Sequence, residues 1–287
     1  MQAWAGRWRP DSTGKAIRLA RLFDSASGRS VVVAVDHALD HGPVPGLEDM
    51  GATLEALMES LPDGLIVRPA TLKRYASVLA RKDGPALIAA LDSRMTASLP
   101  GGDVLGEEHR LLATIEEAVR LGADAVKVLL VFGRRNLAVH AENLERAARV
   151  VAAGDRFGVP VMVETVLWGL SVPADRQNEP EWVRHICRVG AELGADIIKA
   201  PYPPSGFAAI TRELPVPVVI LGGGRTHNDE EFYRMVGRAV DEGAAGVAIG
   251  RNVWQAPSPA QVVRRLKVLV HGRRGPMPGE ASSAGEG

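Results

Sequence analysis

Short apolar runs alternate along the chain with longer stretches in which apolar residues recur at helical spacing. The short runs are continuous rather than alternating, which is typical of parallel strands that are buried on both faces. They predict eight strands, at residues 31–35, 64–67, 86–90, 125–131, 160–164, 196–199, 217–221 and 246–249. The longer stretches predict helices at residues 107–121, 138–157, 180–193, 229–242 and 259–270.

A glycine follows several predicted helices and comes just before a strand, as at Gly122, Gly194 and Gly243. Glycine accepts the left-handed conformation that closes such a turn. The repeated order of strand, helix and glycine turn predicts an α/β protein with a single-domain (β/α)8 TIM barrel. A doubly wound sheet gives a similar alternation. However, no G-x-G-x-x-G motif follows the first strand, which disfavours the dinucleotide-binding form of that fold.

The composition is that of a globular protein with a large core, since 46% of the 287 residues are apolar and 24% are charged. Basic and acidic residues number 34 each, so no net field favours a nucleic acid partner. The single cysteine, Cys187, excludes an internal disulfide framework and a cysteine zinc site. No apolar run reaches the roughly 18 residues that span a bilayer, and residues 1–7 lack the apolar core of a signal peptide. We therefore expect a cytoplasmic protein with no membrane partner.

The chain divides by composition into three segments. Residues 1–30 are expected to form an N-terminal extension, in which Trp4 and Trp8 indicate packing against another surface. Residues 31–271 are expected to form the barrel. Residues 272–287 are rich in Gly, Pro, Ser and Glu and have little apolar content, so we predict that they are disordered.

Two lysines occupy matching positions in a repeated phrase. Leu-Gly-Ala-Asp-Ala-Val-Lys ends at Lys127 and Leu-Gly-Ala-Asp-Ile-Ile-Lys ends at Lys199, and both lysines lie in predicted buried strands. Burial and a nearby cation lower the pKa of a lysine and make it a nucleophile for carbonyl groups. We interpret Lys199 as a Schiff-base nucleophile and Lys127, two strands away, as the neighbouring cation. The alternative is that each lysine is solvated or pairs with a carboxylate and has only a structural role.

In a barrel, the carboxyl ends of the strands build the active site. Other polar residues at those ends are Asp36, His37, Arg68, Asp92 and Glu164. Asp36 and Glu164 are candidates for proton transfer, because carbon–carbon chemistry beside a carbonyl needs a base for the substrate hydroxyl and an acid for the carbinolamine. The alternative is that they only neutralise the two lysines.

A glycine turn follows the seventh predicted strand. Small residues let backbone N–H groups approach an anion, and the loops after the seventh and eighth strands form the phosphate site of many barrels. An arginine after the eighth strand adds a charge-assisted bond. We expect a phosphate site here, although a glycine triplet is often only a turn. Its residues are Gly222, Gly223, Gly224, Gly250 and Arg251.

His37 and His41 lie four residues apart, a spacing that suits metal ligands on a helix. The Gly and Pro residues around them predict a loop instead, so we expect no metal and no cofactor. The other histidines are predicted on helices or at the tail, as solvated or capping side chains. They are His109, His140, His185, His227 and His271.

With these residues in view, residues 31–270 resemble the DeoC/LacD group of class I aldolases. Val-Ala-Val-Asp-His, ending at His37, is similar to the start of archaeal-type fructose-bisphosphate aldolases and aminodideoxyheptulosonate synthases. The segments at Lys199, at residues 215–224 and at residues 248–255 resemble their Schiff-base strand, phosphate turn and eighth-strand signature. The resemblance implies a TIM barrel and a homo-oligomer. The site residues that it implies are a Schiff-base lysine at Lys199, an essential aspartate at Asp36, substrate contact at His37 and phosphate contacts at Gly223, Gly224, Gly250 and Arg251.

The fourth predicted strand departs from the archaeal fructose-bisphosphate aldolases, which carry a tyrosine acid in a Tyr-Pro-Gly context. Here the sequence is Val131-Phe132-Gly133, and Lys127 and Glu164 instead resemble the lysine and glutamate of tagatose-bisphosphate and sulfofructose-phosphate aldolases. We therefore predict a class I aldolase that cleaves or forms a carbon–carbon bond in a phosphorylated ketose. Alternatives are a transfer reaction on the same lysine, as in the heptulosonate synthases or the autoinducer-2 thiolase, a non-catalytic barrel that binds a phosphometabolite, and an isomerase without covalent chemistry.

Overall fold

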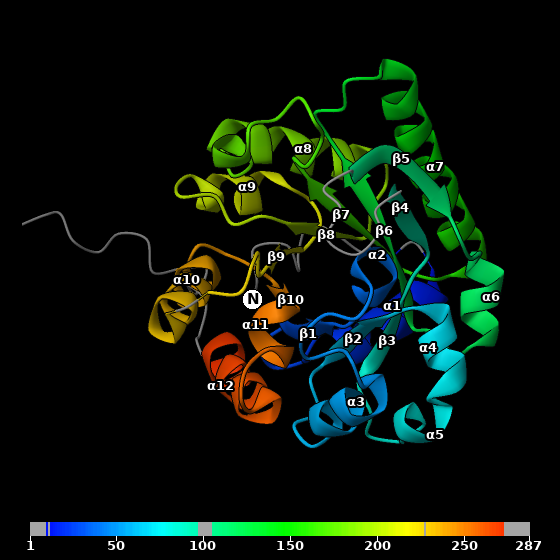
Figure 1. The fold of residues 1–287 in the computed structure, drawn as a ribbon, viewed down its shortest axis with the longest axis vertical. Helices are drawn as coiled ribbons and strands as arrows, with labels where there is room; N and C mark the ends of the chain where they lie inside the picture. The colour runs from blue at the N-terminus through cyan, green and yellow to red at the C-terminus, as the bar shows by residue number, and fades with distance from the viewer. Residues whose placement is uncertain (1–9, 11, 97–104, 227, 273–287) are drawn as a thin grey trace, which may run out of the picture.

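The computed structural model describes residue 10 and residues 12–96, 105–226 and 228–272. Within these ranges, eight parallel strands close into a barrel in the order β1-β10-β9-β8-β7-β6-β3-β2. Helices surround the barrel, as the view along its axis shows (Figure 1). The barrel strands are β1 (Ser30–Ala34), β2 (Gly64–Val67), β3 (Ala86–Ala90), β6 (Ala125–Val131), β7 (Val161–Val166), β8 (Ile197–Ala200), β9 (Val218–Leu221) and β10 (Gly246–Ile249). The prediction of a TIM barrel is therefore confirmed.

The surrounding helices pack their apolar faces on the outside of the strands and form the largest core of the described residues. Their boundaries agree with the predicted helices to within about two residues, except at residues 107–121. Gly122, Gly194 and Gly243 have positive φ angles, as predicted for the turns that they close. The helices that follow the barrel strands are α2 (Ala38–His41), α3 (Met50–Met58), α4 (Pro69–Arg74), α5 (Ala76–Leu79), α6 (Ile115–Arg120), α7 (Leu137–Phe157), α8 (Pro180–Glu192), α9 (Phe207–Glu213), α10 (Asp229–Asp241), α11 (Arg251–Trp254) and α12 (Pro259–Gly272), with a 3-10 turn η1 (Ala174–Arg176). The prediction of a loop at His37 and His41 is wrong for residues 38–41, which form one helical turn that ends at Gly42.

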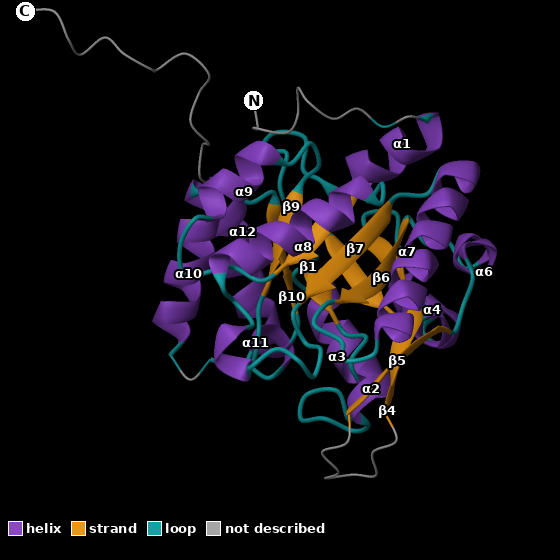
Figure 2. Ribbon diagram, turned by 90° about the horizontal axis from the view of Figure 1, so that it is seen from above, coloured by secondary structure: helices purple, strands orange, loops and turns teal. Residues whose placement is uncertain are grey.

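The N-terminal end of the barrel is covered by helix α1 (Thr13–Leu22). Leu19, Leu22 and Phe23 join the inward-facing residues of the strands in one buried cluster. Lys15 fixes the helix, because its buried Nζ lies 3.0 Å from Asp196 Oδ1. Figure 2 shows α1 at the end of the barrel opposite the site described below. Trp4 and Trp8, for which we expected packing, lie outside the described residues. Of the predicted tail at 272–287, only Gly272 is described, and it ends helix α12.

The prediction of one helix over residues 107–121 is wrong. The chain instead forms a strand, β5 (Leu105–Leu111), which pairs antiparallel with β4 (Asp92–Thr96), before the short helix α6 begins at Ile115. The side chain of Thr114 accepts a hydrogen bond from the backbone N–H of Glu117 and caps that helix. The apolar spacing at Leu111 and Leu112 continues the helical pattern, but pairing with β4 determines the structure. Figure 2 shows this hairpin at the carboxyl ends of the barrel strands.

Candidate active site

Three neighbouring strands place charged side chains inside the barrel. Glu164 of β7 is in register with Lys199 of β8, and Lys127 lies on β6. The two oxygens of Glu164 are divided between the lysines: Oε1 lies 2.9 Å from Lys199 Nζ and Oε2 lies 2.8 Å from Lys127 Nζ. One carboxylate therefore links both of the lysines that the sequence singled out.

Asp36, which follows β1, extends this chain of contacts. Its Oδ2 lies 2.9 Å from Lys127 Nζ. Asp36, Lys127, Glu164 and Lys199, here called the charged tetrad, are each 5% or 6% exposed. Buried charges of this kind persist only when they are paired and hydrogen-bonded. The two lysines and two carboxylates satisfy that requirement by balancing one another.

The protonation states follow from opposing effects. Burial alone would raise the pKa of Asp36, but Lys127, His37 and other nearby cations lower it well below its ordinary value. Burial likewise opposes ionisation of Glu164, and the two lysines overcome this and lower its pKa to about 2. Burial would lower the pKa of Lys127, yet Asp36 and Glu164 raise it above the ordinary value. At neutral pH both carboxylates are ionised and Lys127 is an ammonium ion.

His37 lies at the edge of the tetrad. Its Nδ1 is 3.6 Å from Asp36 Oδ1, beyond hydrogen-bond distance, and has no hydrogen-bond partner among the described residues. Burial lowers the pKa of His37 to about 4, and Lys199 and Lys127 contribute in the same direction. The ring is therefore neutral at pH 7. It packs edge-on against Trp254 at a centroid distance of 5.4 Å.

The glycine turn after β9 is held by a buried asparagine, which sequence reasoning did not assign to the site. Asn252 Nδ2 donates to the carbonyl oxygens of Gly222 and Gly224 at 3.0 and 2.9 Å. Its Oδ1 accepts from the backbone N–H of Thr226 at 2.8 Å. Gly223 has a φ of +64°, a conformation that favours glycine. The turn is thus fixed by side-chain bonds from the segment that follows β10.

Gly250 and Arg251 lie beside this turn at the end of β10. A Cβ at Gly250 would lie 2.7 Å from the His37 ring and 2.9 Å from the carbonyl oxygen of Ala34, so only glycine fits. Arg251 is exposed, and no ion pair involving it occurs within the described ranges. The structure therefore brings the predicted phosphate residues next to His37 and the tetrad.

Two of the polar residues at strand ends, Asp92 and Arg68, support the site without belonging to the tetrad. Asp92 accepts from the backbone N–H of Leu129 at 3.0 Å and forms an ion pair with Arg146 of α7. Arg68 Nε donates to the carbonyl oxygen of Asp36 at 3.0 Å, and its NH2 bonds to Asp40 at 3.0 Å. Arg68 thus supports the loop that carries Asp36.

The predictions for the other histidines need one correction. His109 is not solvated on a helix: it lies buried on β5, where its Nδ1 meets the guanidinium of Arg134. His140 and His185 lie on α7 and α8 as predicted, and His227 lies outside the described residues. His271 Nε2 lies 2.8 Å from Asp63 Oδ2. In the described part of the chain, no three His, Cys, Asp or Glu side chains are grouped to hold a metal ion.

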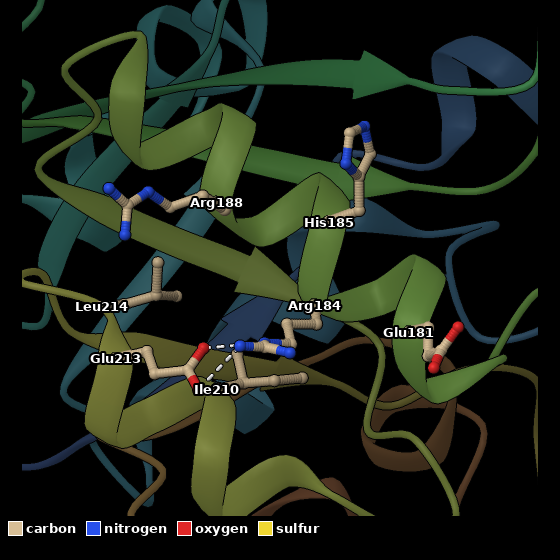
Figure 3. A pocket seen from close by; sticks show the side chains of 7 residues that line it. All are labelled: Glu181, Arg184, His185, Arg188, Ile210, Glu213 and Leu214. Carbon is tan, nitrogen blue, oxygen red and sulfur yellow. Dashed lines mark hydrogen bonds and ion pairs between the residues drawn. The ribbon is translucent and has the colours of Figure 1, made fainter.

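A surface pocket lies on the outside of the barrel between α8 and α9 (Figure 3). Arg184 of α8 crosses it to pair with Glu213 of α9 at 2.7 Å. Its lining includes no residue of the tetrad or the glycine turn, so the pocket is separate from the candidate site. The lining residues are Glu181, Arg184, His185, Arg188, Ile210, Glu213 and Leu214. No helix within the described residues is both long and apolar enough to cross a membrane.

Comparison with known proteins places this architecture in a family. A model of the DeoC/LacD family aldolases matches residues 30–256. The chain is 34% identical to 2-amino-3,7-dideoxy-D-threo-hept-6-ulosonate synthase 1 of Archaeoglobus fulgidus, over 90% of this chain and 92% of that protein. It is 31% identical to 2-amino-4,5-dihydroxy-6-oxo-7-(phosphonooxy)heptanoate synthase of Streptomyces griseus, over 94% and 96%.

A solved structure is similar throughout the barrel. It is an archaeal fructose-1,6-bisphosphate aldolase whose catalytic lysine is covalently bound to the carbinolamine intermediate of its substrate. The TM-score is 0.76 at 28% identity, and the match covers 90% of this chain and 100% of that one. The family match and these relatives agree with the structure, a barrel in which buried lysines lie among carboxylates. The chain is an enzyme that belongs to the DeoC/LacD family of class I aldolases.

Proposed function

We propose that this enzyme makes or breaks a carbon–carbon bond of a phosphorylated ketose through a Schiff base on Lys199. The observation that carries the proposal is the position of Lys199 Nζ, buried at the carboxyl end of β8 and 2.9 Å from Glu164 Oε1. A carboxylate at this distance takes the proton that the lysine must lose before its nitrogen attacks a carbonyl carbon. The glycine turn lies on the next strand, β9, at a suitable place for the phosphate of the same substrate.

The phosphate end of the substrate binds at the glycine turn in this proposal. Backbone N–H groups of Gly223 and Gly224 donate to the phosphate oxygens, since no side chain stands between them and an incoming anion. Arg251 adds a charge-assisted bond from the neighbouring strand end. His37 is neutral at pH 7 and lies beside Gly250, so it donates or accepts a hydrogen bond without adding charge.

The bond-breaking sequence uses all four members of the tetrad. The neutral amine of Lys199 attacks the ketone carbon, and the carbinolamine loses water to give an iminium ion, with Glu164 and Lys127 moving the protons. Asp36 then accepts the proton of the substrate hydroxyl, the carbon–carbon bond breaks, and its electron pair passes to the iminium to form an enamine. Protonation of the enamine carbon and addition of water release the second product and restore Lys199. Bond formation is the reverse.

Transfer of the donor fragment on Lys199 to an aldehyde acceptor is the second candidate, and one observation favours it. The relatives from Archaeoglobus fulgidus and Streptomyces griseus are both named synthases, and the latter has a phosphonooxy product. The same tetrad serves this direction, because the donor enamine on Lys199 attacks whichever aldehyde lies opposite Asp36. Addition of acceptor distinguishes the two: cleavage of ketose phosphates proceeds without it, whereas transfer yields product only with it.

The test is borohydride reduction of the enzyme mixed with dihydroxyacetone phosphate, followed by peptide mass analysis. We expect the reduced adduct on the peptide that contains Lys199. Lys199→Met should give no adduct. Lys127→Met removes the other buried lysine and should still give an adduct at Lys199, formed more slowly because Lys127 helps to move the protons. An adduct on Lys127, or activity that survives Lys199→Met, would refute the proposal and favour an isomerase without covalent chemistry.

We further propose a cytoplasmic homo-oligomer, on the basis of the family resemblance. Several large apolar side chains are exposed at one end of the barrel, among them Leu137 at 78% and Leu170 at 48%. Both lie beside Glu107 of the hairpin, which accepts from the backbone N–H of Leu170 at 3.2 Å. Light scattering of the purified chain decides the oligomeric state, and a monomeric mass would contradict the proposal.

A further inference from the structure

The β4–β5 hairpin lies between barrel strand β3 and helix α6, and it carries an arginine toward the active site. Arg94 of β4 places its guanidinium over the ring of Trp168, 5.4 Å from the ring centroid. Trp168 follows β7, the strand of Glu164. An arginine stacked on an aromatic face keeps the edge of its planar fork available for an anion.

The platform under Arg94 is fixed by apolar packing. Trp168 packs on a small cluster formed by Leu129, Val131 and Val166, inward-facing residues of β6 and β7, and Leu221 of β9 packs on the same cluster. Val131 and Val166 lie opposite each other, one inward-facing position beyond Glu164 toward the carboxyl ends, and Leu129 is level with Glu164. Arg94 therefore lies over the β6–β7 side of the site.

The hairpin itself is anchored, so Arg94 has little freedom to move away. Asp92, two residues earlier, forms a buried ion pair with Arg146 of α7. His109 is directly opposite Arg94 in the strand register and meets the guanidinium of Arg134. These buried contacts tie both strands of the hairpin to the segment that follows β6.

Arg94 has no ion-pair partner among the described residues. The nearest carboxylates are already in use: Asp40 binds Arg68 and Ser93, and Glu164 binds the two lysines. Burial lowers the pKa of Arg94, and Asp40 and Glu164 partly oppose that effect. A half-buried guanidinium close enough to feel the charge of Glu164 thus lacks a counter-ion of its own.

The position of Arg94 relative to Lys199 identifies the part of the substrate that it faces. The glycine turn and Arg251 follow β9 and β10, on one side of β8, whereas Arg94 and Trp168 lie over β6 and β7, on the other. A substrate bound to Lys199 with its phosphate at the glycine turn extends its other end toward Arg94. That end leaves or arrives as the aldehyde.

We propose that Arg94, held over Trp168, binds an anionic group on the aldehyde part of the substrate and so selects charged over neutral aldehydes. The inference rests on the proposed function, since it assumes a ketone donor on Lys199. The group is a carboxylate or a phosphate, because a guanidinium fork forms paired hydrogen bonds with either.

The experiment measures kcat/KM for addition of dihydroxyacetone phosphate to two matched pairs of aldehydes. One pair is succinic semialdehyde and butanal, and the other is glyceraldehyde 3-phosphate and glyceraldehyde. One charge-assisted hydrogen-bonded contact corresponds to a preference of about tenfold to a hundredfold for the charged member. The pair with the larger preference identifies the group as carboxylate or phosphate.

Arg94→Met should bring the two members of the preferred pair to within about threefold of each other, and Arg94→Lys should retain part of the preference. The matched control is Arg110→Ala on β5, because Arg110 belongs to the same hairpin but is exposed and pairs with Glu108 and Glu142. This variant should keep the full preference. Equal losses for charged and neutral aldehydes in Arg94→Met, or an unchanged preference, would overturn the proposal.

A binding measurement separates this inference from the proposed function. Calorimetric titration with succinate, which needs no reaction, should show binding to the wild type and to Arg110→Ala and at least tenfold weaker binding to Arg94→Met. Loss of the borohydride adduct in the wild type would refute the Schiff-base proposal while the titration still decides the anion site. Equal affinity of all three proteins for succinate, or no binding by any of them, would count against Arg94.

Discussion

Glu164 is the residue at which a small change tests the tetrad most directly. Glu164→Gln keeps the volume of the side chain but removes its charge. The carbonyl oxygen of glutamine can still accept a hydrogen bond from one lysine. Its NH2 group would face the ammonium group of the other lysine, and since both groups are donors, no hydrogen bond can form there. Lys199 would lose its ion pair with Glu164, and Lys127 would keep Asp36 at 2.9 Å.

The magnitude follows from the distances. At 2.8 and 2.9 Å, and with an effective dielectric constant near 20, each contact of Glu164 amounts to about 6 kcal/mol of Coulomb energy. Most of this offsets the cost of burying the charges, and loss of one partner from a buried pair typically costs about 3–5 kcal/mol. For a chain of this size such a loss lowers Tm by roughly 10 °C. The catalytic loss is separate, and removal of a proton-transfer group typically lowers kcat by about a hundredfold to ten-thousandfold.

The assay combines three readouts at a temperature where the variant is folded by circular dichroism. We expect kcat to fall at least a hundredfold, Tm to fall, and the borohydride adduct on Lys199 still to form, more slowly. Glu192→Gln is the matched control, since Glu192 is exposed and pairs with Arg188 of the same helix. If Glu164→Gln retained kcat within about threefold of the wild type while Tm fell, the carboxylate would be structural and the proton-relay reasoning would be refuted.

Three further predictions concern parts of the fold around the tetrad. Lys15→Met should destabilise the chain by about 3–5 kcal/mol in urea unfolding, because it leaves Asp196 buried without its cation. His109, whose pKa is lowered to about 2 by burial and nearby cations, must stay neutral in the folded state, so stability is lost as pH falls below 6.5. Between pH 7 and 5 this loss is about 2 kcal/mol and should disappear in His109→Gln but not in the control His185→Gln, at an exposed site. Asn252→Ala should free the glycine turn and raise KM for the phosphorylated substrate about tenfold, with kcat little changed.

The barrel was predictable because its signal is local and repeated. Strands buried on both faces read as continuous apolar runs, and four of the eight predicted ranges coincide with observed strands, at 64–67, 86–90, 125–131 and 246–249. The repeated Leu-Gly-Ala-Asp phrase has a structural explanation in its aspartates. Asp124 and Asp196 accept from the backbone N–H groups of Leu87 and Val161, each on a neighbouring strand, at 3.0 and 2.8 Å. The repeat therefore marks where strands are joined at the N-terminal end, and the lysines that follow it differ in their contacts.

The hairpin was not predictable by the same reasoning. Residues 107–121 carry apolar positions at helical spacing, yet the residues up to Leu111 pair with a strand that precedes them, at separations of 9 (Thr96 with Leu105) to 19 positions (Asp92 with Leu111). Whether such a segment forms a helix or a strand depends on its tertiary partner, since hydrogen bonding to β4 outweighs the local apolar pattern. One signal was available: Thr114 followed three residues later by Glu117 is the start of a helix, which limits the helix to residues after 114. Because the hairpin was not predicted, His109 was placed on a helix and Arg94 was not assigned to the site.

The pairing pattern within the tetrad also depends on three dimensions. The sequence identified all four residues but pointed to Lys127 as a free cation near Lys199, whereas Glu164 lies between them and contacts both. Strand register explains the difference, because Glu164 is level with Lys199 and Lys127 is one inward-facing position lower, level with Met162. The relative positions of side chains along the barrel axis depend on how the strands are staggered when the barrel closes, and the sequence of a single strand does not reveal them.

The balance of charge in the tetrad suggests how the site accepts anionic substrates without losing its reactivity. Two lysines and two carboxylates cancel, so a proton can pass from Lys199 to Glu164 without changing the net charge of the buried layer. We propose that anions bind at the rim, to the glycine turn and Arg251 on one side and to Arg94 on the other. An anion at either place therefore does not need a lysine of the tetrad as its counter-ion. A second anionic group therefore binds without competing with Glu164 for the lysines, and selectivity at the rim can change while the proton transfers at Lys199 stay the same.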